Sequence, residues 1–236
     1  LSARDGSLWV GFGTLGGVAR IADGAATEYT DKDGLADGDV NAIVEDVRGT
    51  IWVASHGGLS SFDGRRWSKT GAEDGLPTSP VLRIWCDSRG RLWVVTATGL
   101  YRREVDASQF TLIEPGRDGD LAEDLAGAVW ITDPDEAFRD VGRTSVNATR
   151  RAFRSATGRA LLVDRSGALW VGTRGAGLLR VFGDTRGVDP QRVEQLSRRQ
   201  GLLSDEVRAL VQDHHGSIWI GSRRGLTRLS ASSLRI

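Results

Sequence analysis

The chain has 236 residues, and its 31 basic and 31 acidic side chains give a formal net charge of zero, which provides no field that would attract nucleic acid or an anionic membrane. Its 39% hydrophobic and 26% charged content excludes a disordered or fibrous class, and 31 glycines against five prolines indicate many tight turns. We therefore expect a folded protein that binds no nucleic acid.

Cysteine and apolar content narrow the class further. Cys86 is the only cysteine, so neither an intramolecular disulfide nor a cysteine-based metal cluster can form. No run of about 18 apolar residues occurs, so no part of this segment is expected to insert into a membrane. The chain starts at Leu1 without a Met or a signal-peptide pattern, which suggests a fragment of a longer protein.

Short strands recur along the chain from its first residues. One strand type, which we call B, contains a Trp and is predicted at residues 8–11, 51–54, 92–95, 129–132, 169–173 and 218–222. Five of these follow another short apolar run, strand A, rich in β-branched residues, such as residues 40–44 or 207–211. Runs of this length and composition, bounded by turn residues, favour strands over helices.

An Asp-x-x-Gly-x-x-Trp motif joins strand A to strand B. The Asp is expected to accept hydrogen bonds from the backbone of the turn, and the Gly to supply a positive φ. The motif is found in five copies, with a partial copy at Gly6 and Trp9: Asp46, Gly49 and Trp52; Asp87, Gly90 and Trp93; Asp124, Gly127 and Trp130; Asp164, Gly167 and Trp170; Asp213, Gly216 and Trp219.

Two further strands complete each repeat. A glycine-containing loop leads into strand C, as at Gly58-Leu59 and Gly225-Leu226, and a weaker strand D carries an apolar residue such as Trp67. Successive repeat tryptophans are separated by 43, 41, 37, 40 and 49 residues. Four antiparallel strands in about forty residues describe the blade of a β-propeller, and the ladders of a solenoid, the main rival fold, are absent. The tryptophans are then expected to pack between neighbouring blades.

We expect an all-β chain that forms a single β-propeller domain over residues 1–236. Its blades are predicted at residues 1–31, 32–71, 72–114, 115–153, 154–198 and 199–236. The first repeat enters at its A-B turn and lacks strand A, so a ring of six blades does not close. The chain is therefore interpreted as a fragment of a seven-bladed propeller, with the missing sequence before residue 1 or after residue 236.

The repeat unit resembles the two-component regulator propeller repeat. It is most complete from Gly201-Leu202 through Asp213, Gly216 and Trp219 to Gly225-Leu226, whereas the sialidase, quinoprotein and WD-repeat motifs have different spacings or pairs. In that family, such propellers form the periplasmic sensing regions of bacterial histidine kinases, hybrid kinases or diguanylate cyclases. The resemblance implies a non-enzymatic, periplasmic sensor module whose membrane helix and output domain lie outside this sequence.

No catalytic residue, metal site or cofactor is predicted. Nucleophile elbows, phosphate loops and His-x-x-x-His pairs are absent, and the five motif aspartates are equivalent by repetition, so a turn role explains all of them. His214 and His215 fall in an A-B turn, where exposed polar residues are expected.

Candidate ligand-binding residues lie in the loops that vary between repeats. The B-C and D-A loops emerge on one face of a propeller, and variable loops on a rigid scaffold usually carry function. The candidates are His56 in the second repeat, Asp133 and Asp135 in the discordant loop of the fourth, Arg174 in the fifth, and Arg223 and Arg224 in the sixth. Arginines facing an acidic loop are suited to an anionic or sugar ligand.

The leading hypothesis is therefore a sensor that binds an unknown small molecule or glycan, or contacts a second propeller or adjacent domain, with a homodimer as one assembly. Two alternatives stay open at this point. One is an interaction scaffold without a ligand, and the other is a carbohydrate-active or lyase-type propeller enzyme, which requires a metal or a His/Glu pair on the variable face.

Overall fold

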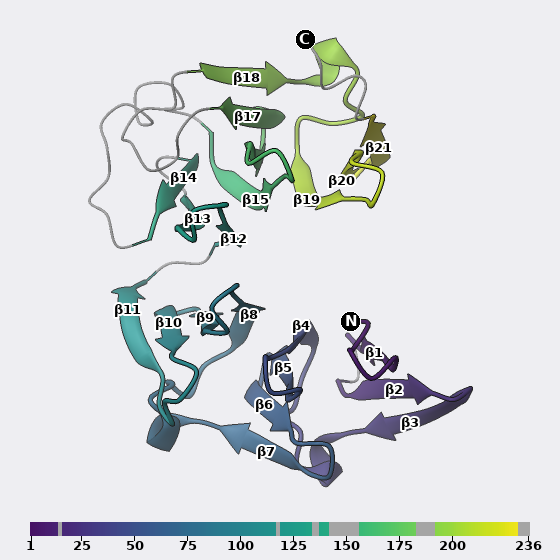
Figure 1. Ribbon diagram of the computed structural model, residues 1–236, viewed down its shortest axis with the longest axis vertical. Coiled ribbons are helices and arrows are strands. Elements are labelled where there is room, and N and C mark those ends of the chain that lie inside the picture. The colour runs from purple at the N-terminus through teal and green to yellow at the C-terminus, as the bar shows by residue number, and fades with distance from the viewer. Residues whose placement is uncertain (14–15, 117–118, 134–136, 142–155, 183–191, 231–236) are drawn as a thin grey trace. The chain divides into compact units, whose positions relative to one another are not determined.

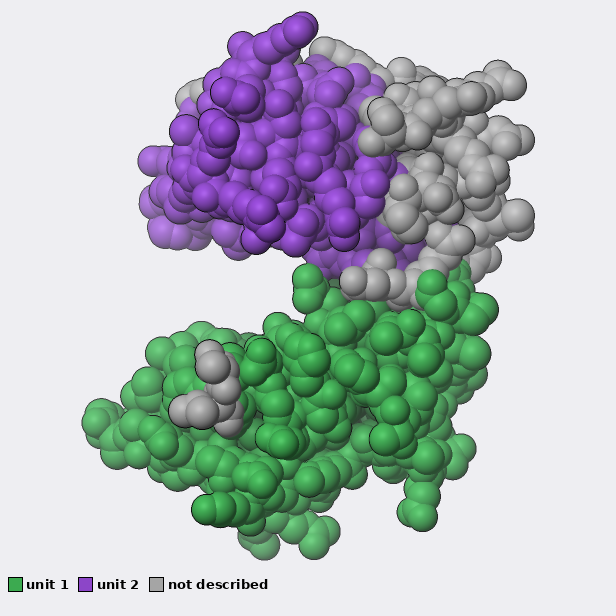
Figure 2. Space-filling view, turned by 180° about the vertical axis from the view of Figure 1, so that it is seen from behind, with its two compact units in different colours: residues 1–118 green, residues 119–236 purple. Residues whose placement is uncertain are grey.

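The computed structural model describes residues 1–236 except 14–15, 117–118, 134–136, 142–155, 183–191 and 231–236. These residues form 21 strands and three short 3₁₀ helices (Figure 1). The chain divides into two compact units, Leu1–Asp118 and Gly119–Ile236, which are coloured separately in Figure 2.

Unit 1 contains three antiparallel sheets, each formed by strands that are consecutive in the chain. The first has β1 (Leu8–Gly11), β2 (Val18–Ala22) and β3 (Ala25–Tyr29). After the 3₁₀ helix η1 (Asp31–Asp33), the second has β4 (Val40–Glu45), β5 (Ile51–Ser55), β6 (Gly58–Phe62) and β7 (Trp67–Thr70). After η2 (Ala72–Asp74), the third has β8 (Val81–Cys86), β9 (Leu92–Thr96), β10 (Gly99–Arg103) and β11 (Thr111–Pro115).

Unit 2 repeats this arrangement with three more sheets. The fourth sheet has β12 (Leu121–Glu123), β13 (Val129–Asp133) and β14 (Ala137–Asp140). The fifth has β15 (Gly158–Val163), β16 (Leu169–Thr173), β17 (Leu178–Phe182) and β18 (Arg192–Leu196). After η3 (Arg198–Gln200), the sixth has β19 (Val207–Gln212), β20 (Ile218–Ser222) and β21 (Gly225–Leu229).

Each sheet is an up-and-down meander of the kind that makes a propeller blade, so the all-β blade architecture predicted from the sequence is confirmed (Figure 1). In the described residues, sheets one, four and six have three strands. The first repeat was expected to lack strand A, and the positions expected for strand D in sheets four and six lie outside the described residues. In the first sheet, Ser2 forms an isolated antiparallel bridge with Leu8 in place of strand A. The interpretation of residues 1–236 as one propeller domain stays a prediction.

In the first, second, fourth and fifth sheets, the tryptophan of strand B packs toward the following sheet of the same unit. Trp9 joins a buried cluster with Ile51 and Val53 of the second sheet. Trp170 likewise packs with Ile218 and Ile220 of the sixth sheet and is 0% exposed. The residues on either side of one tryptophan therefore meet the tryptophan of the preceding sheet, and full burial of such an aromatic side chain contributes about 2–3 kcal/mol.

A β-bulge recurs near the start of strand A. The pairing of strand A with strand B shifts register between Val40 and Ala42, between Val81 and Arg83, between Gly158 and Ala160, and between Val207 and Ala209. The inserted residues are Asn41, Leu82, Arg159 and Arg208. Because a bulge changes the direction of the side chain it carries, these positions are suited to presenting a side chain outside the regular ladder.

Candidate functional site

The Asp-x-x-Gly-x-x-Trp motif has a structural role in every complete copy. In the second sheet, Oδ1 of Asp46 accepts the backbone N–H groups of Arg48 and Thr50, and Oδ2 accepts the indole N–H of Trp52 at 2.9 Å. Gly49 has a φ of 85°, which a residue with a side chain resists. The Asp carboxylate therefore accepts three hydrogen bonds that hold the turn and the Trp ring in place.

The predicted ligand-binding residues fall into both units. His56 is exposed in the loop between β5 and β6 of unit 1, where its N–H donates to the Asp39 carbonyl at 3.1 Å. Arg174, Arg223 and Arg224 are exposed in the corresponding loops of unit 2. The side chain of Asp133 and all of Asp135 lie outside the described residues.

Within unit 2, the loop conformations are fixed by backbone hydrogen bonds to the neighbouring D-A segments. The N–H of Arg174 donates to the Thr157 carbonyl at 3.0 Å, and the N–H of Gly177 donates to the Asp205 carbonyl at 2.9 Å. In the sixth sheet, by contrast, the bond is local: the N–H of Arg224 donates to Oγ of Ser222, at the end of β20, at 3.2 Å. The B-C loops and the D-A segments of unit 2 thus share one face, as the strand directions predict.

Glu206, just before β19, is the centre of a charged cluster on this face. Its Oε1 accepts hydrogen bonds from Nη1 of Arg159 at 3.2 Å and from Nε and Nη2 of Arg208 at 3.1 and 3.0 Å. Its Oε2 lies 3.7 Å from Nε of Arg223. The Arg208 hydrogen bonds outweigh the opposing effect of desolvation and hold the pKa of Glu206 below its ordinary value, so the carboxylate is charged at neutral pH.

Of these four residues, only Arg223 was predicted from the sequence, and Arg159, Glu206 and Arg208 were missed. Arg159 and Arg208 are the bulge residues of neighbouring strands A, and the equivalent residues in sheets two and three are Asn41 and Leu82. An arginine that appears at the same repeat position in two successive blades, where other blades have uncharged residues, was the available sign of this cluster.

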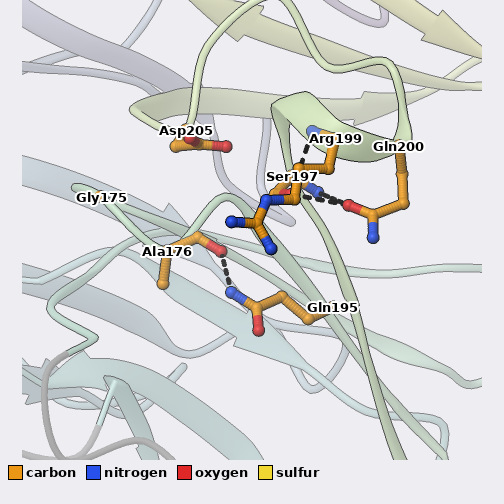
Figure 3. Close-up of a pocket in the computed structure, with 7 residues that line it drawn as sticks. All are labelled: Gly175, Ala176, Gln195, Ser197, Arg199, Gln200 and Asp205. Atoms are coloured by element: carbon orange, nitrogen blue, oxygen red, sulfur yellow. Dashed lines mark hydrogen bonds between the residues drawn. The ribbon is translucent and has the colours of Figure 1, made fainter.

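A polar pocket of about 310 Å³ lies on the same face, between the β16–β17 loop and the segment that joins β18 to β19. Its walls combine backbone, amide, hydroxyl and charged groups from Gly175, Ala176, Gln195, Ser197, Arg199, Gln200 and Asp205. Figure 3 shows the Arg199 guanidinium among these residues, directed toward the middle of the group.

Hydrogen bonds order the walls of this pocket. Nε2 of Gln195 donates to the Ala176 carbonyl at 2.7 Å, and the hydroxyl of Ser197 donates to Oε1 of Gln200 at 2.6 Å. Oδ1 of Asp205 accepts the N–H of Arg198 at 2.7 Å. A lining of this kind suits a small polar ligand with hydroxyl or charged groups better than an apolar ligand.

In the part of the chain that the structure describes, no group of three or more His, Cys, Asp or Glu side chains is arranged to hold a metal ion. The ring centroids of His214 and His215 lie 3.8 Å apart in the A-B turn of the sixth sheet. This turn follows β19, whereas Glu206 precedes it, so the two histidines are at the other end of that strand. Among the described helices, none is long and apolar enough to cross a membrane.

Meandering antiparallel blades, each complete motif of which joins its Asp to its Trp by a hydrogen bond, are those of a β-propeller. Residues 34–57 and 201–224 match the family described as Two component regulator propeller, which confirms the resemblance of the repeats. No curated protein matches the chain.

Solved structures share this fold. The extracellular domain of the hybrid two component system BT3049 from B. thetaiotaomicron aligns with a TM-score of 0.74 and 17% identity, over 99% of this chain and 34% of that chain. The extracellular domain of BT4673 from the same organism aligns with a TM-score of 0.66 and 17% identity, over 97% and 37%. A streptogramin B lyase aligns with a TM-score of 0.65 and 13% identity, over 97% and 80%. This chain therefore spans about a third of the length of the two extracellular domains.

Proposed function

We propose that this chain is the non-enzymatic input segment of a bacterial signal-transduction protein, located in the periplasm, where it binds a small polar molecule or glycan. The match of residues 34–57 and 201–224 to the two-component regulator propeller carries this proposal. The extracellular domains of two signalling systems from B. thetaiotaomicron have the same fold, which agrees with an extracytoplasmic location.

The loop face of unit 2 supports a binding role. It combines the polar pocket around Arg199 and Asp205 with the charged cluster around Glu206, which directly follows Asp205 in the chain. Polar groups that converge on a concave surface of a rigid scaffold are the usual features of a ligand site. Ligand contact at this face provides a way to change the association of the chain with a second copy or an adjacent domain.

The proposal of a non-enzymatic function is supported by the structural role of the motif aspartates. Each of the five motif aspartates accepts an indole N–H and turn N–H groups, so the most regular carboxylates of the chain serve the scaffold. The likeness to a streptogramin B lyase, at 13% identity, concerns the fold and not the chemistry.

Thermal-shift and limited-proteolysis screens of the 236-residue chain against glycans and small polar metabolites test the proposal. A ligand that raises the melting temperature and protects the β16–β17 loop supports it, and light scattering reports whether dimerisation changes. Silence across a broad panel, with unchanged dimerisation, contradicts ligand sensing. Alkaline phosphatase fused after residue 236 in the full-length protein tests the location, since activity requires export.

A further inference from the structure

We propose that Arg159, Arg208 and Arg223 form a binding site for the carboxylate of a small polar ligand, and that Glu206 is the internal group that this carboxylate displaces. The inference rests on the proposed function, because it assigns a ligand class to the same face. It starts from the observation that three guanidinium groups from three different elements surround one carboxylate.

The cluster has an excess of positive charge. Three arginines and one ionised glutamate leave a local charge of two, and Arg174 and Arg224 are exposed on the same set of loops. Arg159 and Arg208 share a single oxygen of Glu206, Oε1. The other oxygen, Oε2, lies 3.7 Å from Nε of Arg223, which is too far for a hydrogen bond. Glu206 therefore satisfies the cluster incompletely, and a second carboxylate is electrostatically favoured here.

The exposure of these side chains fits a ligand site better than a structural ion pair. The side chains of Arg159 and Arg208 are each 35% exposed, that of Arg223 is 69% exposed, and that of Glu206 is 26% exposed. A carboxylate from solvent can reach all three arginines. At the same time, partial desolvation of Arg159 and Arg208 makes their hydrogen bonds to an anion stronger than those of fully exposed residues.

The fold does not require arginine at these positions. Arg159 and Arg208 are bulge residues, and the same bulge is formed with Asn41 in the second sheet and Leu82 in the third. The bulge thus places the two guanidinium groups near Glu206. The bulge itself is formed by the backbone and does not need an arginine side chain. A side chain that the scaffold does not need, in a bulge that redirects it, is expected to serve recognition.

Glu206 also connects the cluster with the adjacent pocket. It follows Asp205, which lines the pocket and whose carbonyl accepts the N–H of Gly177 from the β16–β17 loop. Release of Glu206 from its arginines therefore changes a segment that is bonded to that loop. A ligand whose carboxylate binds the arginines can place a hydroxyl-bearing body against the pocket walls, so ligand binding and loop position are coupled.

Calorimetric titration of the 236-residue chain with sodium galacturonate, sodium succinate and neutral galactose tests this inference. We expect at least one of the two carboxylates to bind and galactose to bind far more weakly. Binding of galacturonate identifies a sugar acid as the source of the carboxylate, and binding of succinate alone identifies a dicarboxylate. Equal binding of galactose and galacturonate, or a dissociation constant above about 10 mM for both carboxylates, overturns the inference.

Charge-neutral variants separate a ligand site from a structural ion pair. Arg208→Gln and the more exposed Arg223→Gln are each expected to weaken carboxylate binding by roughly ten-fold or more, because charged hydrogen bonds are lost. Glu206→Gln is expected to strengthen it several-fold, because the internal competitor loses its charge. Arg89→Gln, on an exposed A-B turn of unit 1, is the matched control and leaves binding unchanged.

Opposite effects of Arg208→Gln and Glu206→Gln on affinity are the decisive result. If Glu206→Gln weakens binding as much as Arg208→Gln, displacement of Glu206 is wrong. If both arginine variants fold, as circular dichroism reports, and bind the probe as tightly as the unmodified chain, the site is wrong. A ligand from the broader screen that binds Arg208→Gln normally leaves the proposed sensor function intact and overturns only this site, whereas carboxylate binding without a response of the full-length protein overturns only the function.

Discussion

The indole Nε1 of Trp170 donates a hydrogen bond of 2.8 Å to Oδ2 of Asp164, six residues earlier in the chain. Both residues are buried, and Oδ1 of the same carboxylate accepts the N–H groups of Ser166 and Ala168. The aspartate thereby ties the A-B turn to the tryptophan that packs against the next sheet. The same bond measures 2.9 Å at Trp52, 2.8 Å at Trp93, 3.1 Å at Trp130 and 2.9 Å at Trp219.

Replacing Asp164 with Asn is predicted to destabilise unit 2. An amide NH₂ group must then face either the indole N–H or the N–H groups of Ser166 and Ala168, so one buried donor meets another donor. The loss of charge-assisted hydrogen bonds in a buried setting costs about 2 kcal/mol. Urea unfolding measures the cost, and Asp106→Asn, whose side chain is 93% exposed, is the control with an expected change within about 0.5 kcal/mol. Equal effects of the two variants contradict the prediction.

The first sheet solves the same problem with different residues. Ala3 occupies the position of the motif Asp, as shown by its N–H, which donates to the Ser7 carbonyl at 2.8 Å in the way that Asp46 donates to Thr50. Nε1 of Trp9 donates instead to Oγ of Ser7 at 3.1 Å, and Ser7 donates to Asp5. The hydrogen bonds from Ser7, followed by that from Arg20, lower the pKa of Asp5 to about 2.

Ser7→Ala is therefore predicted to destabilise unit 1, because it leaves the buried indole N–H of Trp9 without its acceptor. The expected cost is about 1–3 kcal/mol. Adding Ala3→Asp to this variant restores the motif of the other sheets and is expected to recover most of the loss, as measured by urea unfolding. Failure of the double variant to exceed Ser7→Ala in stability shows that position 3 is not equivalent to the motif Asp.

Strand and turn positions could be predicted from the sequence because they depend on local chemistry. The spacing of Asp, Gly and Trp defines the turn, and the apolar residues around Trp define the strand, so the predicted strands at 8–11, 169–173 and 218–222 have the bounds of β1, β16 and β20. The indole hydrogen bond was not predicted, because sequence spacing alone does not show that the Trp ring turns back to its own aspartate.

The charged cluster was harder to predict because it depends on a register shift. A bulge shifts the register of a strand by one residue and leaves no sign in the pattern of apolar residues. The direction in which the Arg159 and Arg208 side chains point could therefore not be predicted from the sequence. Glu206 lies in the segment between two repeats, where the sequence offers no fixed spacing. Arg223 was found because the predicted strand directions place its loop on the variable face.

Neighbouring A-B turns are linked within each unit, which leads to a prediction about local stability. The N–H of Arg165 donates to Oε1 of Gln212, and its Nη1 donates to the His214 carbonyl, both at 2.9 Å. In unit 1, Arg4 makes the equivalent contacts with the Glu45 carboxylate and the Val47 carbonyl. Arginine at this turn position thus bonds one blade to the next.

Arg165→Ala is predicted to loosen the sixth sheet from the fifth. Loss of the guanidinium contact costs about 1 kcal/mol and increases amide hydrogen exchange in β19 and β20 more than in β15 and β16. Hydrogen exchange followed by mass spectrometry separates these peptides. Arg224→Ala, an exposed arginine of the same sheet, is expected to leave the exchange of β19 and β20 unchanged, and an equal increase in both variants contradicts an inter-blade link.

The carboxylates of Asp164 and Asp213 are predicted to make the protein sensitive to acid. Burial raises the pKa of Asp164, but the hydrogen bonds from Ser166 and Trp170 outweigh it and hold the pKa below its ordinary value of 3.8, and the Trp219 hydrogen bond lowers that of Asp213. A carboxyl with a depressed folded-state pKa binds fewer protons in the folded state than in the unfolded state. Its contribution to stability is therefore complete above about pH 5 and is lost as the pH falls through the folded-state pKa.

The urea concentration at the unfolding midpoint is therefore expected to decrease from pH 5 toward pH 2. The decrease is expected to be less steep in Asp164→Asn, whereas Asp106→Asn is expected to keep the slope of the unmodified chain. A midpoint in the unmodified chain that stays constant to about pH 2 contradicts the role of these ionised groups.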